Sequence, residues 1–312
     1  MNEDRRNDEN CGEREFRSGF VAIIGKPNAG KSTLLNRLVG GKIAIVSPKP
    51  QTTRDSILGI LSDESFQIVF VDTPGLIESR NLLNRCLIDS TALAVKEVDL
   101  AYHIVDIADP KPETPAIKNL VRKLSAPRIL VANKIDRLPK PFDPSSIQPV
   151  EKDIAYTDLI GISALQGDNV PLLIRKTVSL LPEGPLYFDP EQMSDRDLRF
   201  LSAEIVREKA FELLGQEIPY SLAVQVEEFK ERPEDKDYIR AVIYVERESQ
   251  KGMVIGAGGN MLKQIGSLAR PDIEELVGKP VFLELWVKVR KNWTKKETDL
   301  RHFGYFPKKN KE

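Results

Sequence analysis

The segment GKPNAGKS, from Gly25 to Ser32, constrains the fold of this chain more than any other feature of its sequence. It matches the pattern G-x-x-x-x-G-K-[ST], whose glycines let the backbone wrap around an anion with several N–H groups pointing inward. In such a loop Lys31 reaches the β- and γ-phosphate oxygens, and the Ser32 hydroxyl binds Mg²⁺. The alternative to a phosphate-binding loop is a glycine-rich turn that binds no ligand. Further motifs along the chain decide between the two. The predicted phosphate-binding residues are Gly25, Asn28, Ala29, Gly30, Lys31, Ser32 and Thr33.

The first half of the chain alternates short apolar runs with stretches of helical pattern. The apolar runs are residues 20–24, 67–71, 100–106, 128–132 and 159–162. The helical stretches are residues 31–39, 81–96, 115–124 and 170–181. This alternation predicts an α/β domain with a mainly parallel sheet. The phosphate loop then joins a strand to a helix N-terminus, which also attracts anions. We place this domain at residues 19–181, after a flexible N-terminal extension of residues 1–18.

The segment Asp72-Thr73-Pro74-Gly75 follows one of the apolar runs. The Asp72 carboxylate would lie at the end of a strand, where it can hold Mg²⁺ through water. The Gly75 amide could then sense the γ-phosphate. This second motif supports a nucleoside triphosphate as the ligand.

The segment Asn133-Lys134-Ile135-Asp136 follows another apolar run and indicates which base is bound. The Asp136 carboxylate can accept hydrogen bonds from N1–H and the 2-amino group of guanine, and adenine offers neither, so the wrong base would leave buried acceptors unpaired. Asn133 would brace the loops, and the Lys134 stem would lie over the base. A backbone amide of Ser163-Ala164, after the next run, could meet guanine O6. Four motifs in this order predict a GTP site.

The second half has a different order of elements. Residues 182–193 read as a linker because they contain three prolines and a glycine. Beyond them the pattern predicts a helix near residues 195–214, strands near 222–229 and 238–246, two short helices around Gly256–Gly259, and a strand at 281–289. The order αββααβ predicts an α+β domain of the type II KH fold at residues 194–292, with a basic C-terminal tail at 293–312. In KH domains a G-x-x-G loop admits a nucleic-acid backbone closely.

Charge is distributed unevenly along the chain. Residues 251–312 carry 13 Lys and Arg against 7 Asp and Glu, whereas the remainder carries more acidic than basic residues. A basic end on an acidic body is typical of a protein in which one domain meets a polyanion, although a solvated charged surface gives the same count. Trp293 is the better candidate for stacking on bases, and Trp286 is expected in the core. The further RNA-binding candidates are Gly256, Ala257, Gly258, Gly259, Lys251, Lys263, Lys288, Arg290 and Lys291.

Several classes of protein are excluded by composition. No apolar run approaches the roughly 18–20 residues that cross a bilayer, and the polar N-terminus lacks the apolar core of a signal peptide. Two cysteines and two histidines make neither a disulfide framework nor a metal site with regular spacing. We therefore expect a cytoplasmic protein.

The four nucleotide motifs resemble those of the translation-factor-like class of P-loop GTPases over residues 20–181. By this resemblance the segment Gln51-Thr52-Thr53-Arg54 is the mobile first switch, and Thr53 binds Mg²⁺ and the γ-phosphate. Leu76 stands where Ras-like members place a water-orienting Gln. Either hydrolysis is slow and a partner supplies groups, or another element of the chain compensates. In relatives with an asparagine at the position of Asn28, that side chain helps to hold a potassium ion. Potassium-stimulated hydrolysis is one hypothesis, and a purely structural Asn28 is the other.

The whole chain, over about residues 18–306, resembles the Era family of bacterial ribosome-assembly GTPases. The resemblance rests on the nucleotide motifs and on three segments of the second half, FLSAEIVREKAF at 200–211, YVERESQKGMVIGAGG at 244–259 and ELWVKVRKNW at 284–293. It implies a protein that binds the 3′ region of 16S ribosomal RNA, assists 30S subunit maturation, and holds RNA when GTP is bound. It also implies a loose association with the inner membrane. We expect the protein to be a monomer.

One residue departs from the family pattern. Ala257 occupies the first variable position of the G-x-x-G loop, where many relatives carry a lysine. The loss of one phosphate contact should weaken RNA binding and lower its salt slope by roughly one. The sequence is also compatible with two other functions. The chain could be a GTPase that acts on tRNA or the large subunit, or an RNA-binding scaffold whose nucleotide pocket no longer hydrolyses GTP.

Overall fold

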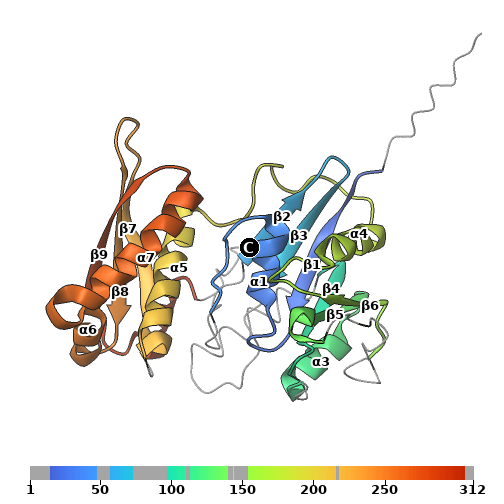
Figure 1. The fold of residues 1–312 in the computed structure, drawn as a ribbon, viewed down its shortest axis with the longest axis horizontal. Coiled ribbons are helices and arrows are strands. Elements are labelled where there is room, and N and C mark those ends of the chain that lie inside the picture. Colours follow the sequence, from blue (N-terminus) through green and yellow to red (C-terminus); the bar gives the residue numbers. More distant parts are fainter. Residues whose placement is uncertain are drawn as a thin grey trace, which may run out of the picture.

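A computed structural model of the chain describes residues 15–47, 57–72, 97–109, 113–139, 143, 154–215 and 218–305. It forms two bodies joined by the segment that precedes helix α5 (Figure 1). Some predicted features lie outside the described residues: the Gln51–Arg54 segment with Thr53, the Thr73–Gly75 segment with Gly75, Leu76, and the helix expected at residues 81–96.

A six-stranded sheet with strand order β2-β3-β1-β4-β5-β6 forms the first body. Only β2 runs antiparallel to its neighbour β3; the other pairs are parallel. The α/β prediction is therefore confirmed. The strands are β1 (Arg17–Ile24), β2 (Ile57–Ser62), β3 (Phe66–Asp72), β4 (Leu100–Asp106), β5 (Arg128–Asn133) and β6 (Asp158–Ile162).

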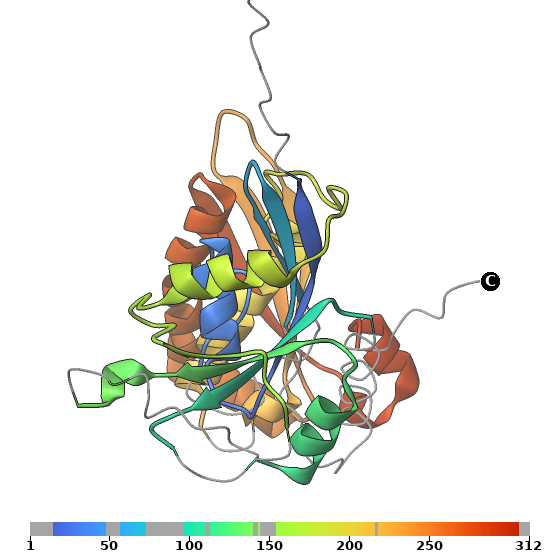
Figure 2. The ribbon, with the colours of Figure 1, turned by 90° about the vertical axis from the view of Figure 1, so that its right-hand side faces the viewer.

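Helices cover both faces of this sheet. Helices α1 (Lys31–Val39) and α4 (Val170–Leu180) pack one face, where Leu34, Leu35 and Leu173 join the main core. Helix α3 (Pro115–Lys123) packs the opposite face through Ile117 and Val121. Figure 2 shows α3 and α4 on either side of the central strands. Because parallel strands all end at one edge, the loops after β1, β5 and β6 meet there, beside the end of β3 at Asp72.

The linker runs along the first body. The Gln67 side chain of β3 accepts hydrogen bonds from the Tyr187 and Phe188 amides at 2.8 and 3.0 Å. Its amide nitrogen donates to the Phe188 carbonyl at 2.9 Å. Farther along, the Ile60 amide donates to the Met193 carbonyl at 2.9 Å. These bonds fix the point at which the chain enters the second body.

The second body has the order αββααβ, which confirms the KH fold. Its three-stranded sheet has the order β7-β8-β9, with β7 antiparallel and β9 parallel to the central β8. Helices α5 and α7 pack on one face of the sheet around Val206, Ile243 and Ile273. The elements are α5 (Leu198–Leu213), β7 (Ala223–Lys230), β8 (Asp237–Val245), α6 (Glu248–Ile255), α7 (Asn260–Val277) and β9 (Val281–Val289).

The other face of the KH sheet is partly covered by the C-terminal segment. A short 3-10 turn at Trp293–Lys295 and helix α8 (Glu297–His302) pack there, so residues 293–305 are folded rather than an extended tail. The Trp293 side chain is fully buried, and its Nε1 donates to the Ser221 carbonyl at 2.8 Å. The prediction that Trp293 stacks on bases is wrong for this arrangement. Trp286, expected in the core, is 49% exposed.

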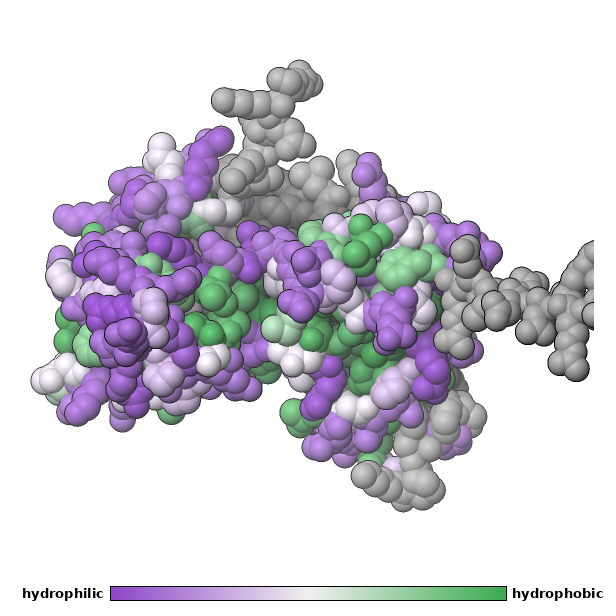
Figure 3. Space-filling view, turned by 90° about the horizontal axis from the view of Figure 1, so that it is seen from above, coloured by the Kyte–Doolittle hydropathy of each residue, from purple (hydrophilic) through white to green (hydrophobic). Residues whose placement is uncertain are grey.

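Seen from above, the KH body presents mostly hydrophilic residues, and hydrophobic residues gather where the two bodies adjoin (Figure 3). None of the helices in the described part of the chain combines the length and apolar character needed to cross a membrane.

Candidate nucleotide and RNA sites

The phosphate loop is shaped by close backbone approaches at two glycines. Gly30 has φ +99°, and a Cβ there would lie 2.2 Å from Asn133 Nδ2. A Cβ at Gly25 would lie 2.3 Å from the Ile104 carbonyl oxygen. Asn28 also has a positive φ of 65°. The loop is thus wrapped tightly against β4 and β5, as a phosphate cradle requires.

The Lys31 ammonium lies over this loop. Its Nζ donates to the Gly25 and Lys26 carbonyls at 2.9 and 2.8 Å. Burial lowers the pKa of Lys31 to about 8, although the Asp72 and Glu113 carboxylates act in the opposite sense. A phosphate chain would favour the charged form and raise this pKa again.

The residues predicted to hold Mg²⁺ lie side by side. Ser32 Oγ donates to Asp72 Oδ2 at 3.2 Å, and Asp72 is fully buried at the end of β3. A hydroxyl and a carboxylate are the hard oxygen ligands that Mg²⁺ prefers, and a buried carboxylate is stabilised by a nearby cation. The pair therefore fits Mg²⁺. No cluster of three His, Cys, Asp or Glu side chains that could hold a further metal is found in the described part of the chain.

Asn133 joins three of the predicted motifs. Its Nδ2 donates to the Ala29 carbonyl at 2.8 Å, and its Oδ1 accepts from the Ala164 amide at 2.9 Å. The side chain is buried, so both bonds are shielded from water. The phosphate loop, the Asn-Lys-Ile-Asp segment and the Ser163-Ala164 loop are thereby held as one unit.

The residues predicted to contact the base lie at the same edge of the sheet. Lys134 Nζ donates to the Asn28 carbonyl and to Asp106 Oδ2, both at 2.6 Å. Asp136 Oδ1 accepts from Ser163 Oγ at 2.6 Å. The bond from Ser163 holds the carboxylate that would read N1–H and the 2-amino group. Thr33 follows Ser32 in the first turn of α1 and is half-buried.

Sequence reasoning missed two acidic residues around the loop. Asp106 ends β4 and holds Lys134, and its position at a strand end was a usable signal. Glu113 is buried 3.9 Å from the Lys26 ammonium and contributes to the electrostatics of Lys31. Glu113 follows a loop without a motif, so only the fold brings it to the site.

The G-x-x-G loop joins α6 to α7 on the KH domain. Gly256, Gly258 and Gly259 have φ values of 73°, 57° and 80°. An added Cβ at Gly256 would lie 2.7 Å from Met261 Cβ, whereas Gly258 and Gly259 face open space. Ala257, between Gly256 and Gly258, is exposed. The loop precedes the 18-residue helix α7, whose N-terminus favours phosphate.

The predicted cations of the KH domain fall into two groups. Lys288 Nζ pairs with Glu227 at 2.7 Å, and Arg290 pairs with Asp299 at 2.7 Å, so both are engaged within the domain. Lys263 and Lys291 are exposed and Lys251 is half-buried. No ion pair is recorded for these three within the described residues. Lys263 lies one turn into α7 and is the nearest of them in sequence to the loop.

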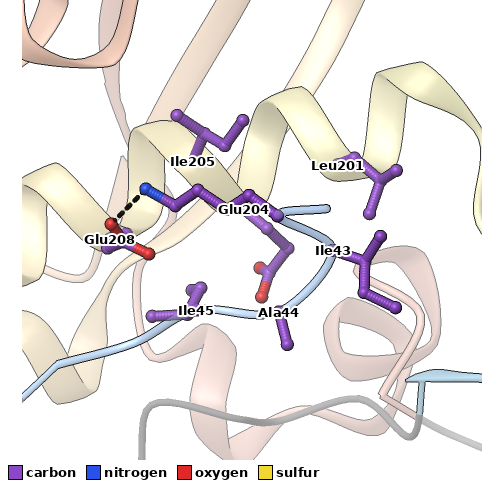
Figure 4. A pocket seen from close by; sticks show the side chains of 8 residues that line it. Ile43, Ala44, Ile45, Leu201, Glu204, Ile205 and Glu208 are labelled. Carbon is purple, nitrogen blue, oxygen red and sulfur yellow. Dashed lines mark hydrogen bonds and ion pairs between the residues drawn. The ribbon is translucent and has the colours of Figure 1, made fainter. Parts of the chain in front are cut away.

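The two bodies meet at the segment that follows α1. Lys42 Nζ lies 2.7 Å from Glu208 Oε1 of α5 and 2.5 Å from Asp272 Oδ2 of α7. The Val46 amide donates to Glu208 Oε2 at 3.1 Å. Figure 4 shows this seam, with the Lys42–Glu208 ion pair as a dashed line. Ile43, Ala44 and Ile45 face Leu201, Glu204 and Ile205.

A cavity at this seam measures about 10 Å³, at the lower limit for one water molecule. The seam is therefore a packed interface and not a ligand site.

Proteins of known family resemble this chain along nearly its whole length. A protein named GTPase Era from Geotalea daltonii is 46% identical over 94% of this chain and 99% of its own length. GTPase Era from Caldanaerobacter subterraneus is 46% identical over 93% of this chain and 98% of its own length. This chain belongs to the Era family of GTPases. It is accordingly a GTPase that binds GTP and GDP, with a C-terminal KH domain.

Solved structures and domain families agree with this membership. Era from Aquifex aeolicus, as a variant bound to GDP and AlF₄⁻, has a TM-score of 0.86 and 37% identity, and covers 94% of this chain and 100% of its own. Era in complex with MgGDPNP and nucleotides 1506–1542 of 16S ribosomal RNA has a TM-score of 0.84 and 36% identity, over 94% and 100%. The family "50S ribosome-binding GTPase" matches residues 20–134, and "KH domain" matches residues 217–294.

Proposed function

We propose that this Era-family GTPase binds the 3′ region of 16S ribosomal RNA and assists maturation of the 30S subunit under the control of GTP. The observation that carries the proposal is the full-length likeness to a relative solved with MgGDPNP and 16S nucleotides 1506–1542. We assign RNA binding in this chain to the G-x-x-G loop and the N-terminus of α7, where exposed backbone precedes a long helix.

The nucleotide residues take the following roles in this proposal. Lys31 and the amides of the phosphate loop stabilise charge on the β- and γ-phosphates. Asp136 and the Ser163-Ala164 loop select guanine. Ser32 and Asp72, with Thr53, would hold Mg²⁺, which neutralises phosphate charge when bound. Gly75 would sense the γ-phosphate. Because Leu76 cannot orient water, Asn28 with a potassium ion remains our hypothesis for assisting hydrolysis.

The seam between the domains offers the route of control. Residues 42–47 contact α5 and α7 and lead in sequence straight to the Gln51–Arg54 segment. Helix α7 begins at the G-x-x-G loop. A change near Thr53 on GTP binding would therefore act on Lys42 and, through Asp272, on the RNA-binding helix. This gives the two-state element that a nucleotide switch needs.

Protonation does not open this contact at neutral pH. Partial burial of the Asp272 carboxylate would raise its pKa, but the Lys42 and Lys209 ammonium groups outweigh burial and hold the pKa below its ordinary value. A carboxylate with a lowered pKa contributes stability at all pH values above its unfolded pKa, and loses it only as pH falls into the acid range. Movement of residues 42–47, and not a proton, is the proposed trigger.

A second candidate is action on the large subunit. The GTPase family that matches residues 20–134 is described as 50S ribosome-binding. That match omits the KH domain, whereas the relative solved with 16S RNA covers both domains, so we favour the small subunit.

Crosslinking of the protein to cellular RNA separates these candidates. We expect recovered reads to concentrate in the last few tens of nucleotides of 16S RNA. Reads concentrated in 23S RNA or in tRNA would overturn the assignment to the small subunit. A Gly258→Asp variant, which places a negative charge at the exposed loop, is expected to lose the 16S signal and to keep GTP hydrolysis.

We propose a monomer in the cytoplasm with a loose, peripheral association with the inner membrane, and a domain division at residues 181–194. Fractionation of cells at low and high salt tests the membrane association, which should be released by salt.

A further inference from the structure

The side chain of Arg37 joins helix α1 to the loop that follows β6. Its Nε donates to the Ala164 carbonyl at 3.3 Å, and its Nη2 donates to the Leu165 carbonyl at 2.5 Å. The guanidinium also lies against Gly167, where an added Cβ would be 3.9 Å from Nε. Because α1 begins at Lys31, Arg37 ties the helix of the phosphate loop to the loop predicted to meet guanine O6.

The helix dipole offers a simpler explanation for an arginine at position 37. A cation in the last turn of a helix interacts favourably with the helix dipole, and Arg37 lies in the last turn of α1. That effect requires only proximity to the carbonyls of α1 itself. The two bonds instead reach carbonyls about 130 residues farther along the chain. The fork of the guanidinium is therefore used to hold another loop.

These two bonds fix the direction of particular backbone amides. The Ala164 carbonyl and the Leu165 N–H belong to one planar trans peptide group and point in opposite directions. Holding the carbonyl therefore also orients that N–H. In the same way, Arg37 holds the peptide group that ends in the Gln166 N–H. That N–H donates to Ser163 Oγ at 3.0 Å, and the same hydroxyl donates to Asp136.

Within residues 163–167, the stretch that Arg37 contacts, one amide is left for a ligand. The amides of Ser163 and Gly167 donate to backbone carbonyls, and those of Ala164 and Gln166 donate to side chains. Among the described residues, the Leu165 N–H has no recorded acceptor. The two amides of the predicted Ser163-Ala164 motif are both engaged, since the Ser163 N–H donates to the Asp168 carbonyl at 3.0 Å and the Ala164 N–H to Asn133 Oδ1 at 2.9 Å.

We propose that Arg37 is a positioning residue for guanine recognition, which orients the Ala164–Leu165 peptide so that the Leu165 N–H meets guanine O6. Arg37 itself does not touch the nucleotide. The proposal rests on the binding of guanine nucleotides and not on the RNA-binding part of the proposed function, so each can fail without the other.

The test measures affinities of the full-length chain for three nucleotides by titration calorimetry. GDP offers O6, 6-thio-GDP replaces O6 by sulfur, which is a weak acceptor, and IDP keeps O6 but lacks the 2-amino group read by Asp136. The variants are Arg37→Ala and Arg37→Lys. The matched control is Arg175→Ala, an exposed arginine on the neighbouring helix α4.

We expect Arg37→Ala to weaken GDP binding by about threefold to tenfold, because two hydrogen bonds from a charged donor at an exposed site are lost. The preference for GDP over 6-thio-GDP should shrink by a similar factor, while the preference for GDP over IDP changes by less than about twofold. Arg37→Lys should lie between wild type and Arg37→Ala, since an ammonium cannot present the same fork to two carbonyls.

Two results overturn the proposal. Equal losses for all three nucleotides would show that Arg37 supports the fold of the domain without orienting the O6 donor. Unchanged affinities in Arg37→Ala would show that the loop keeps its conformation without the guanidinium. Arg175→Ala should match wild type for all three nucleotides. Its deviation from wild type gives the smallest change in affinity that can be attributed to Arg37.

Discussion

At the scale of single residues, the nucleotide site depends on close approaches that only particular side chains permit. Gly30 combines a positive φ with a contact that no Cβ could make, because Asn133 Nδ2 occupies that space. Asn133 in turn holds two loops through its amide. The chemistry of the site thus follows from backbone shape at least as much as from charge.

Replacement of Gly30 by alanine should abolish measurable GDP binding. The new methyl group would lie 2.2 Å from Asn133 Nδ2, so the phosphate loop or Asn133 must move. Gly40→Ala is the matched control, because Gly40 has φ +73° but an added Cβ meets nothing within 4 Å. The control should cost about 1 kcal/mol of stability and leave GDP affinity unchanged. Equal loss of binding in both variants would refute the steric argument.

The lowered pKa of Lys31 predicts that nucleotide binding takes up a proton in mildly alkaline solution. Lys31 titrates at about 8 without nucleotide, and phosphates favour its charged form and raise its pKa. At about pH 8.5 the amine is mostly neutral before binding and mostly protonated after it, so uptake should exceed half a proton. Near pH 7 uptake at this group should be small. Calorimetry in buffers of different ionisation enthalpy measures this. Equal uptake at both pH values would contradict the assigned pKa.

At the scale of elements, the KH sheet shows how an apolar pattern can mislead about which face is covered. Alternation along β9 places Trp286 on the face away from the helices, where Arg240 lies over its ring at 5.8 Å. The cover of that face comes from residues 293–305, which bury Trp293 instead. Nothing within β9 itself indicates where that later segment packs.

The two tryptophans should therefore respond oppositely to truncation. Trp293→Ala removes a fully buried ring and a hydrogen bond, and should cost about 3–5 kcal/mol of unfolding free energy. Trp286→Ala removes a half-exposed ring and should cost less than about 1 kcal/mol. Urea unfolding followed by circular dichroism compares the two. Equal costs, or the reverse order, would refute the described packing.

Much of the fold was predictable from the sequence, and the omissions have physical causes. The bounds of β4 and β9 were predicted because β4 is mostly apolar and β9 has regularly alternating apolar positions. Strand β2 was missed because Gly59 interrupts its pattern, yet that glycine is needed where Leu35 Cδ1 of α1 would lie 2.4 Å from a Cβ. The nucleotide motifs placed the main site residues, whereas Arg37, Lys42 and Glu113 act through contacts between distant segments that no local pattern records.

The G-x-x-G loop allows a test of the alanine that departs from the family pattern. Ala257→Lys adds a cation at an exposed loop position and should tighten RNA binding while raising the salt slope by roughly one. Ser267→Lys adds the same charge at an exposed position two turns along α7, and should change the slope by less than half as much. Equal slopes in the two variants would show that the loop does not contact a phosphate.

At the scale of the whole molecule, two domains share an interface that includes the segment before the first switch. Lys42 bridges to helices α5 and α7 of the KH domain, whereas Lys209 pairs with the same carboxylates, Glu208 and Asp272, from within that domain. The cluster is partly exposed, so Lys42 should contribute about 1–2 kcal/mol to the contact. An energy of this size can shift an equilibrium about tenfold, as a nucleotide switch requires.

The ratio of RNA affinities in two nucleotide states tests directly whether GTP controls RNA binding through the Lys42 contact. Binding of a 3′-terminal 16S RNA fragment would be measured with a non-hydrolysable GTP analogue and with GDP, in wild type, Lys42→Met and Lys209→Met. We expect tighter binding with the GTP analogue by at least about tenfold in wild type, a ratio kept in Lys209→Met and reduced towards unity in Lys42→Met. The same RNA affinity in both nucleotide states of the wild-type protein would contradict this expectation.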